Sequence, residues 1–150
     1  MSSQSTIKLG LPRDRGGFTL IEILVTISII ALLTMIGITN FRVANQKARD
    51  GRRQGDLEQI KAALELYRTD QNVYPTTAEW PGVGGTLAVG GTTYMQTVPE
   101  DPLSAYSYYY SGDGDTYTLC AALELDTSGA CGGASCGSGI TCNYQLTSPL

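Results

Sequence analysis

The fold of this 150-residue chain is decided by residues 18–41, which read FTLIEILVTISIIALLTMIGITNF. Glu22 is the only charged residue in this run. A helix rises 1.5 Å per residue, so the run spans roughly 36 Å, more than the ~30 Å hydrocarbon core of a bilayer. The rest of the chain is too small and too rich in glycine to enclose such a helix. We therefore predict that residues 18–41 cross a membrane as one helix.

The sequence around this run differs from an ordinary secretory signal, in which a short apolar core is followed by a small-x-small cleavage site. Here the helical pattern continues with Asn40 and Arg42, and no Ala-x-Ala follows. Instead, a basic leader ending in Gly17 directly precedes Phe18. A carboxylate at mid-bilayer costs about 2.5–3.5 kcal/mol. Glu22 therefore either reaches the headgroups or has a functional partner.

Charge divides the chain into two parts. All ten Lys and Arg lie at or before Arg68, whereas the residues after Thr69 include eight acids and no base. The net charge of -4 argues against a strongly basic nucleic-acid-binding protein. The chain has no His, which excludes Ser-His and Cys-His catalysis and histidine-ligated metal sites. We predict that the protein is not an enzyme.

Residues 15–25, RGGFTLIEILV, resemble the class III signal of type IV pilins and type II secretion pseudopilins. The shared features are a Gly before the cut, an aromatic residue after it, and a Glu four residues further on. The resemblance implies that a prepilin peptidase cuts between Gly17 and Phe18 and that the new amine of Phe18 is N-methylated. It also implies that Glu22 pairs with the Phe18 amine of a neighbouring subunit, a role that fits the cost of an unpaired buried charge.

The resemblance continues in residues 48–77, which look like the helix end and first loop of the major pseudopilin of type II secretion. VPEDP at residues 98–102 is similar to the Pro-x-Asp-Pro segment of that family. The chain departs from the family in two places. Gly37 stands near the position where many relatives have a helix-melting Pro, and a cysteine-rich segment replaces the family's C-terminal calcium loop. Whether the helix melts near Gly37 stays open.

Two patterns follow the apolar run. Leu57, Ile60, Leu64 and Tyr67 form one helical stripe, which predicts a helix face packed on the protein's own head. A basic cluster also lies here, made of Arg42, Lys47, Arg49, Arg52 and Arg53. Nucleic acid or anionic lipid could bind it. We favour a solvated helix face, or pairing with Asp50, Asp56 and acids of neighbouring subunits.

The head is expected to contain a small antiparallel sheet. Residues 106–110 and 116–123 are β-prone runs around a Gly/Asp turn, which predicts a hairpin. Alternation at Ile140, Cys142, Tyr144 and Leu146 predicts a third strand. We interpret the Gly-rich residues 82–94 as a connection with one short strand.

Metal sites are poorly supported by the head sequence. Asp113 and Glu124 have EF-hand spacing, but Thr118 stands where that loop requires Gly. A hairpin turn explains these acids better, although a calcium site involving head carboxylates stays an alternative. We expect no other cofactor.

The head contains four cysteines, Cys120, Cys131, Cys136 and Cys142, with no C-x2-C pair among them. A zinc ribbon is therefore a weak alternative to two disulfides, for which three connectivities exist. Small exported domains often need such covalent staples. We favour a local Cys131–Cys136 bridge and a Cys120–Cys142 bridge.

The expected architecture is an α+β, pilin-like fold, in which a long N-terminal helix packs on a small antiparallel β-sheet head. Residues 1–17 would be a cytoplasmic leader, 18–41 the transmembrane and assembly helix, and 42–150 the amphipathic half of the helix with the exported head. Three bases precede the apolar run and five lie shortly after it, so the positive-inside rule favours the opposite orientation. The exported head is implied by the pilin resemblance instead.

The expected function is structural: a subunit of a membrane-anchored helical filament, specifically a type II secretion pseudopilus. Its expected partners are copies of itself, minor pseudopilins or pilins, the prepilin peptidase, the inner-membrane assembly platform and membrane lipid. A surface type IV pilin for adhesion, motility or DNA uptake is the nearest alternative. A single-span membrane protein that displays a binding or enzymatic ectodomain is a further one.

Overall fold

The computed structural model describes residues 16–126 and 131–149, without the side chains of residues 36–39. The described part contains a helix α1, Leu20–Gln71, followed by five short strands. The chain divides into two compact units, residues 1–40 and 41–150, and the boundary falls inside α1. The predicted pilin-like α+β class is confirmed: one long N-terminal helix precedes small antiparallel sheets.

The first unit is the apolar part of α1. Every described side chain from Phe18 to Met35 is exposed, including large aliphatic residues such as Ile21 and Leu33. An 18-residue stretch of this helix is long and apolar enough to cross a membrane. The helix backbone continues through Gly37. Since these side chains have no packing partner in their own unit, a lipid or protein environment must supply it.

The second unit begins with the remaining turns of α1, which carry the predicted apolar stripe. Leu57, Ile60 and Leu64 are fully buried and Tyr67 is nearly so, as the helical spacing predicted. Asn72 follows the helix with φ of 61° and donates its N–H to the carbonyl of Arg68 at 2.8 Å. Asn tolerates this left-handed conformation, which ends a helix by bonding one of its last carbonyls.

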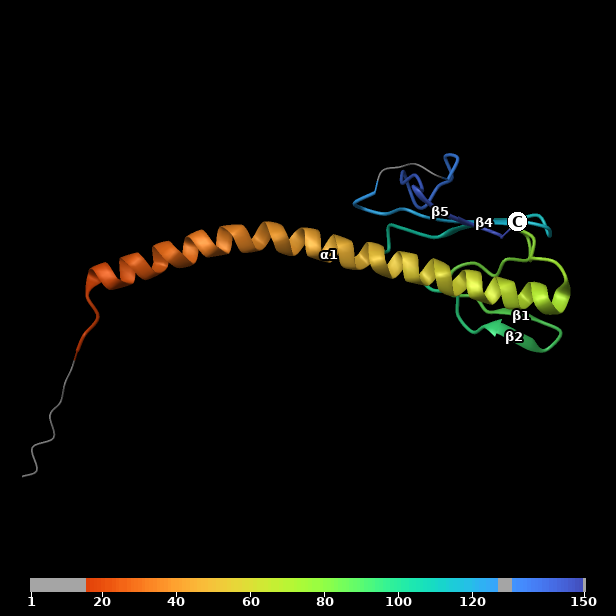
Figure 1. Cartoon of the computed structure of the whole chain (residues 1–150), viewed down its shortest axis with the longest axis horizontal. Helices are drawn as coiled ribbons and strands as arrows, with labels where there is room; N and C mark the ends of the chain where they lie inside the picture. The colour runs from red at the N-terminus through yellow and green to blue at the C-terminus, as the bar shows by residue number, and fades with distance from the viewer. Residues whose placement is uncertain (1–15, 127–130, 150) are drawn as a thin grey trace, which may run out of the picture. The chain divides into compact units, whose positions relative to one another are not determined.

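Three strands form the main sheet: β3 Tyr109–Gly112, β4 Tyr117–Ala121 and β5 Tyr144–Thr147. They are antiparallel in the order β3-β4-β5, so the predicted hairpin is confirmed. The predicted third strand is confirmed at Tyr144 and Leu146, whereas Ile140 and Cys142 lie before it in the segment of the Cys136–Cys142 bond. Figure 1 shows the second half of α1 with this sheet on one side and a further hairpin on the other. The main core contains the helix stripe and apolar residues of both sheets.

The further hairpin is β1 Leu87–Val89 and β2 Thr92–Met95, where the sequence led us to expect one short strand. Gly90 and Gly91 join the strands with φ of 60° and 88°. Two consecutive positive φ angles are what a two-residue hairpin turn requires, and Gly supplies them without strain. The Gly-Gly pair between LAV and TTYM signals this hairpin in the sequence, but we had interpreted it as part of a connection.

The disulfides join Cys120 to Cys131 and Cys136 to Cys142. The pairing that we favoured from the sequence is therefore wrong, although the prediction of two disulfides is confirmed. An isolated antiparallel bridge between Ser135 and Thr141 folds the intervening residues back on themselves. The Cα atoms of Cys136 and Cys142 consequently lie 5.1 Å apart, within bridging distance. Since all four sulfurs are bonded, none can serve as a zinc thiolate.

Candidate assembly site and buried ion cluster

The predicted processing residues lie in the short non-helical segment that precedes α1. Gly16, Gly17 and Phe18 are exposed, and 84% of the Phe18 surface is accessible. No atom lies within 4 Å of where a Cβ on Gly17 would be. This backbone is open on all sides, as cleavage by a peptidase would require. The leader residues Lys8, Arg13 and Arg15 lie outside the described residues.

Glu22 and Thr19 form a reciprocal cap at the start of α1. Glu22 Oε2 accepts the backbone N–H of Thr19 at 2.8 Å and its hydroxyl at 2.9 Å. The backbone N–H of Glu22 in turn donates to Thr19 Oγ1 at 3.3 Å. This arrangement is a capping box, which satisfies N–H groups that have no partner inside the helix. The Thr-x-x-Glu pattern signals it, but the sequence analysis did not use that signal.

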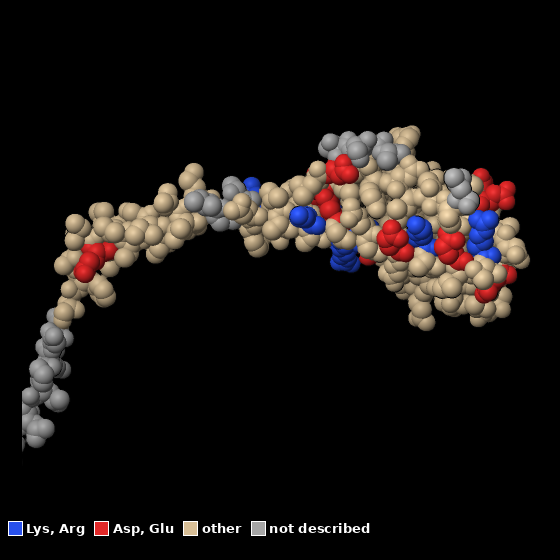
Figure 2. Space-filling model, viewed as in Figure 1, with Lys and Arg blue, Asp and Glu red and all other residues tan. Residues whose placement is uncertain are grey.

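The cap fixes where the Glu22 carboxylate lies. Oε2 is held at the peptide nitrogen that joins Phe18 to Thr19, so the carboxylate lies beside Phe18. Both contacts to Thr19 use Oε2, which leaves Oε1 able to accept another donor. Figure 2 shows the first unit with a single patch of acidic atoms, because Glu22 is the only charged residue in its described part. An amine from another molecule would therefore find one carboxylate to pair with in the described part of this unit, residues 16–40.

A buried ion cluster lies in the second unit, made of Arg49, Asp50, Arg53, Asp101 and Glu124. Arg53 is fully buried on α1. Its Nη1 donates to Asp50 Oδ1 at 2.8 Å and to Glu124 Oε1 at 2.9 Å. Its Nε and Nη2 donate to the two oxygens of Asp101 at 2.7 and 3.0 Å. A buried guanidinium is tolerated only with such partners, because its desolvation is costly.

The cluster also holds the chain segment that follows β4. Asp50 accepts the backbone N–H groups of Glu124, at 2.9 Å, and of Leu125, at 3.0 Å. Arg49 binds both oxygens of Glu124 at 2.6 Å. Hydrogen bonds from Arg49 and Arg53 lower the pKa of Glu124 to about 2 against the effect of burial. This segment is thus attached to α1 by charge rather than by strand pairing.

Two tyrosines complete the surroundings of the cluster. The Arg53 guanidinium lies over the Tyr106 ring, 4.6 Å from its centre. The Tyr108 hydroxyl donates to Asp56 Oδ2 at 2.7 Å. Burial, together with the Asp56 carboxylate, raises the pKa of Tyr108 well above its usual value, so it stays a neutral donor. The ring and the hydroxyl help to exclude water from the ion pairs.

The basic cluster of the sequence therefore has two different parts. Arg49 and Arg53 pair within their own chain, so the expectation of a solvated face is wrong for Arg53, while its pairing with Asp50 is confirmed. Arg42, Lys47 and Arg52 remain exposed. Basic and acidic side chains alternate along the visible face of the second unit (Figure 2). Arg53 lies four residues before Leu57 and so continues the buried helix stripe, which Arg52 does not. The partners of Arg53 could not be predicted, since they include acids 48 and 71 residues later.

The two acids with EF-hand spacing, Asp113 and Glu124, have other roles. Asp113 Oδ1 accepts the backbone N–H groups of Asp115, at 3.0 Å, and of Thr116, at 2.7 Å, in the turn between β3 and β4. Glu124 belongs to the ion cluster. Within residues 16–126 and 131–149, no group of three or more candidate ligands is placed to hold a metal ion.

The fold and these sites define a class of protein: a pilin-like subunit, with a membrane-length helix behind a processing segment and a small disulfide-bonded α+β head. Residues 12–38 match the prokaryotic N-terminal methylation motif. Residues 40–136 match the family described as type II secretion system (T2SS), protein G. Since this match covers more than half of the chain, the protein belongs to that family.

Curated relatives agree with this assignment. The chain is 34% identical over 131 residues to the type II secretion system core protein G of Pseudomonas aeruginosa. The aligned region covers 81% of this chain and 90% of the relative. The chain is 29% identical over 137 residues to the core protein G of Vibrio cholerae, covering 85% and 91%. Identity to the Escherichia coli protein is 30% over 115 residues, covering 71% and 79%. No solved structure matches the chain.

Proposed function

We propose that this protein is the structural subunit of a membrane-anchored helical filament, the pseudopilus of a type II secretion system. One observation carries the proposal: the methylation motif and the protein G family match adjoining parts of the same chain, residues 12–38 and 40–136. The first match covers the processing site and the anchor helix, and the second covers the rest of the helix and most of the head. The role is architectural, and the chain acts as a substrate of maturation enzymes rather than as an enzyme.

Maturation takes place at Gly17 and Phe18. A prepilin peptidase removes residues 1–17 by cutting the bond between them, and the new amine of Phe18 is N-methylated. The exposed backbone before α1 supports this proposal, because the bond is accessible without unfolding the helix.

Glu22 directs assembly. In the apolar surroundings of a membrane or filament core, its carboxylate needs a cation, and the Phe18 amine of a neighbouring subunit provides one. Thr19 already holds Oε2, and Oε1 accepts the incoming amine. Each new subunit is thereby fixed in axial register, since only one position satisfies both charges.

The second unit is exported and the leader is cytoplasmic. The two disulfides support this orientation, because such bonds persist in oxidising compartments outside the cytoplasm. The partners are other copies of the chain, minor pseudopilins, the prepilin peptidase, the inner-membrane assembly platform and lipid. Calcium is not needed to hold the C-terminal segment, since disulfides and the ion cluster already do so.

One observation favours a second candidate, a surface type IV pilin. The Cys136–Cys142 bond closes a short loop near the C-terminus, as in many surface pilins. Deleting the gene separates the two candidates. A pseudopilin mutant loses secretion of exoproteins, whereas a pilin mutant loses surface fibres and keeps secretion.

The filament function itself is tested by N-terminal mass spectrometry of the membrane-extracted protein and by a matched pair of variants. We expect a mature chain that begins with N-methylated Phe18. Glu22→Ala should stay in the membrane but form no filaments, while Glu22→Asp keeps the charge and should retain part of the assembly. An intact leader would instead indicate a single-span membrane protein, and unchanged filaments in Glu22→Ala would remove Glu22 from the mechanism.

A further inference from the structure

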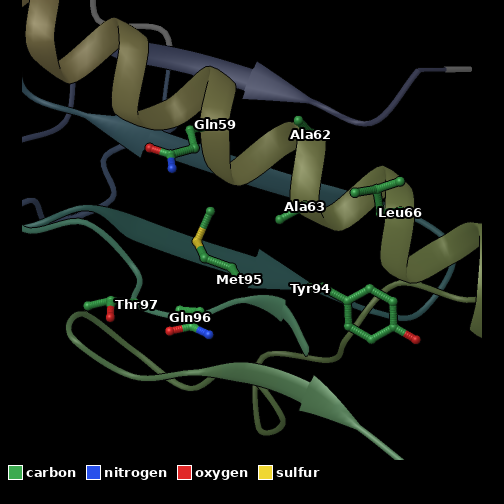
Figure 3. A pocket seen from close by; sticks show the side chains of 8 residues that line it. All are labelled: Gln59, Ala62, Ala63, Leu66, Tyr94, Met95, Gln96 and Thr97. Atoms are coloured by element: carbon green, nitrogen blue, oxygen red, sulfur yellow. The ribbon is translucent and has the colours of Figure 1, made fainter. Parts of the chain in front are cut away.

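Two grooves flank α1 in the second unit. The first groove, of about 530 Å³, lies between α1 and the segment after β4, and its lining includes Val43, Lys47, Gly51, Leu123 and Leu125. The second groove, of about 480 Å³, lies between α1 and β2 (Figure 3), and its lining includes Gln59, Ala62, Ala63, Leu66, Tyr94 and Met95. Both contain exposed aliphatic side chains: Val43 is 53% accessible, Leu125 49% and Leu66 60%. These side chains have apolar surface that their own fold leaves uncovered.

One row of helix positions connects the two grooves. Residues spaced by four form a continuous row on a helix surface. The connecting row consists of Val43, Lys47, Gly51, Gly55, Gln59 and Ala63. Its first three members line the first groove and its last two line the second, with Gly55 between them. The grooves and this row therefore form one path across the outer side of α1, which we call the docking path.

The two glycines on the docking path have open space where a side chain would be. Both are helical, and beyond the surrounding helix backbone no atom lies within 4 Å of where a Cβ on either would be. Gly weakens a helix relative to Ala, so its use here needs another reason. Without side chains, Gly51 and Gly55 expose bare backbone on which a second polypeptide can pack closely.

We propose that the docking path binds a second copy of this chain, through the acidic surface of that copy's second unit. The inference rests on the proposed filament function, which brings copies together. Charge identifies the occupant. Lys47 is the base that lines the first groove; it is exposed and makes no ion pair in the described part of the chain. The two acids in the same lining, Asp50 and Asp126, already have interactions within the chain. Beyond Arg68 the chain offers acids such as Asp70 and Asp115, both exposed, and no base.

The first groove is already formed in the single chain. Its wall at Leu123 and Leu125 is attached to α1 because Asp50 accepts the backbone N–H groups of Glu124 and Leu125. Docking onto a fixed wall costs little ordering entropy, which favours a specific contact over a transient one. The buried ion cluster thus positions an interface as well as stabilising the fold.

Site-specific photocrosslinking of the full chain in filament-forming membranes tests the contact directly. A photoreactive residue replaces Lys47 in one variant and Gln59 in another, and replaces Ser138 in the control. Ser138 is exposed in the loop that the Cys136–Cys142 bond closes, and it lines neither groove. We expect light-dependent dimers from positions 47 and 59, joined to acidic-surface peptides after Arg68, and none from position 138. Crosslinks only to lipid or to other proteins, or none while filaments form, would overturn the inference.

Substitution gives an independent readout. Gly55→Leu fills the docking path, whereas Ser138→Leu adds the same side chain outside it. We expect about tenfold fewer filaments for Gly55→Leu at equal or higher thermal stability, no loss for Ser138→Leu, and a loss for Lys47→Glu but not Lys47→Arg. If wild-type chains form no filaments, the proposed function fails. If they do and Gly55→Leu assembles equally well, only the docking path is wrong.

Discussion

The Arg53 guanidinium lies against the Asp101 carboxylate, with Nε 2.7 Å from Oδ2 and Nη2 3.0 Å from Oδ1, although 48 residues separate the two in sequence. Arg53 belongs to α1, and Asp101 belongs to the Val98–Pro102 segment that leads into the main sheet. The side-chain exposure is 0% for Arg53 and 1% for Asp101. This two-pronged contact therefore attaches the head to the helix in a place that water does not reach.

Arg53→Met should destabilise the protein strongly. Met keeps the aliphatic stem but leaves three buried carboxylates without their shared cation. We therefore expect the free energy of unfolding to fall by about 3–5 kcal/mol. Thermal or urea unfolding of the full chain in detergent measures this. Arg52→Met is the matched control, since Arg52 is 61% exposed and lies 3.7 Å from Asp56. Exposed pairs contribute about 0–1 kcal/mol, so equal effects of the two substitutions would contradict the role given to the buried cluster.

Stability should fall in acid, partly through Glu124. Its pKa is lowered to about 2 in the folded protein, chiefly by its hydrogen bond with Arg49. An unfolded Glu titrates near ~4.3. Because the folded pKa is the lower one, the stabilisation is present above the unfolded value and is lost as pH falls from about 4.3 toward 2. Unfolding midpoints measured from pH 7 to pH 3 should drop more steeply in the wild type than in Glu124→Gln.

Removing the two disulfides should have unequal effects. Cys120–Cys131 closes the longer loop, with a separation of 11 residues against 6, and Cys120 is buried in the central strand β4. A disulfide of this kind stabilises by about 2–4 kcal/mol, with more for longer loops. Ala at positions 120 and 131 should therefore lower the unfolding midpoint more than Ala at 136 and 142. Non-reducing peptide mapping checks the connectivity, and a 120–142 linked peptide would contradict it.

Two glycines should respond to Ala in opposite directions. At Gly112 in β3, a Cβ would collide with the Pro75 carbonyl and the Tyr110 hydroxyl, so Gly112→Ala should destabilise by about 1–3 kcal/mol. At Gly55 in α1, a Cβ meets nothing within 4 Å, so Gly55→Ala should stabilise the helix by ~1 kcal/mol. Thermal unfolding of both variants checks the direction of each change in stability. A stable Gly112→Ala would mean that β3 can shift away from the Pro75 loop.

Several features of this protein are determined locally and can be predicted from the sequence. The length of the apolar run indicates a helix that is long and apolar enough to cross a membrane, and the spacing of Leu57, Ile60 and Leu64 indicates the buried face of α1 farther on. The Gly17–Phe18–Glu22 signal indicates the family before any contact is known. The Gly/Asp turn indicates the β3–β4 hairpin, and Thr-x-x-Glu contains the capping box. In each case a pattern within a few residues is enough, because helix periodicity, turns and caps depend on neighbouring backbone.

Only the tertiary structure decided which acids pair with Arg53, which cysteines pair and where the two grooves lie. Arg52 and Arg53 are adjacent and chemically identical, yet one is exposed and the other is enclosed by three carboxylates. Cys136 meets Cys142 because a bridge at Ser135 and Thr141 turns the backbone, not because of their spacing. These outcomes depend on contacts between segments up to 75 residues apart. The energies of such contacts depend on burial and geometry, and neither can be predicted from a pattern of neighbouring residues.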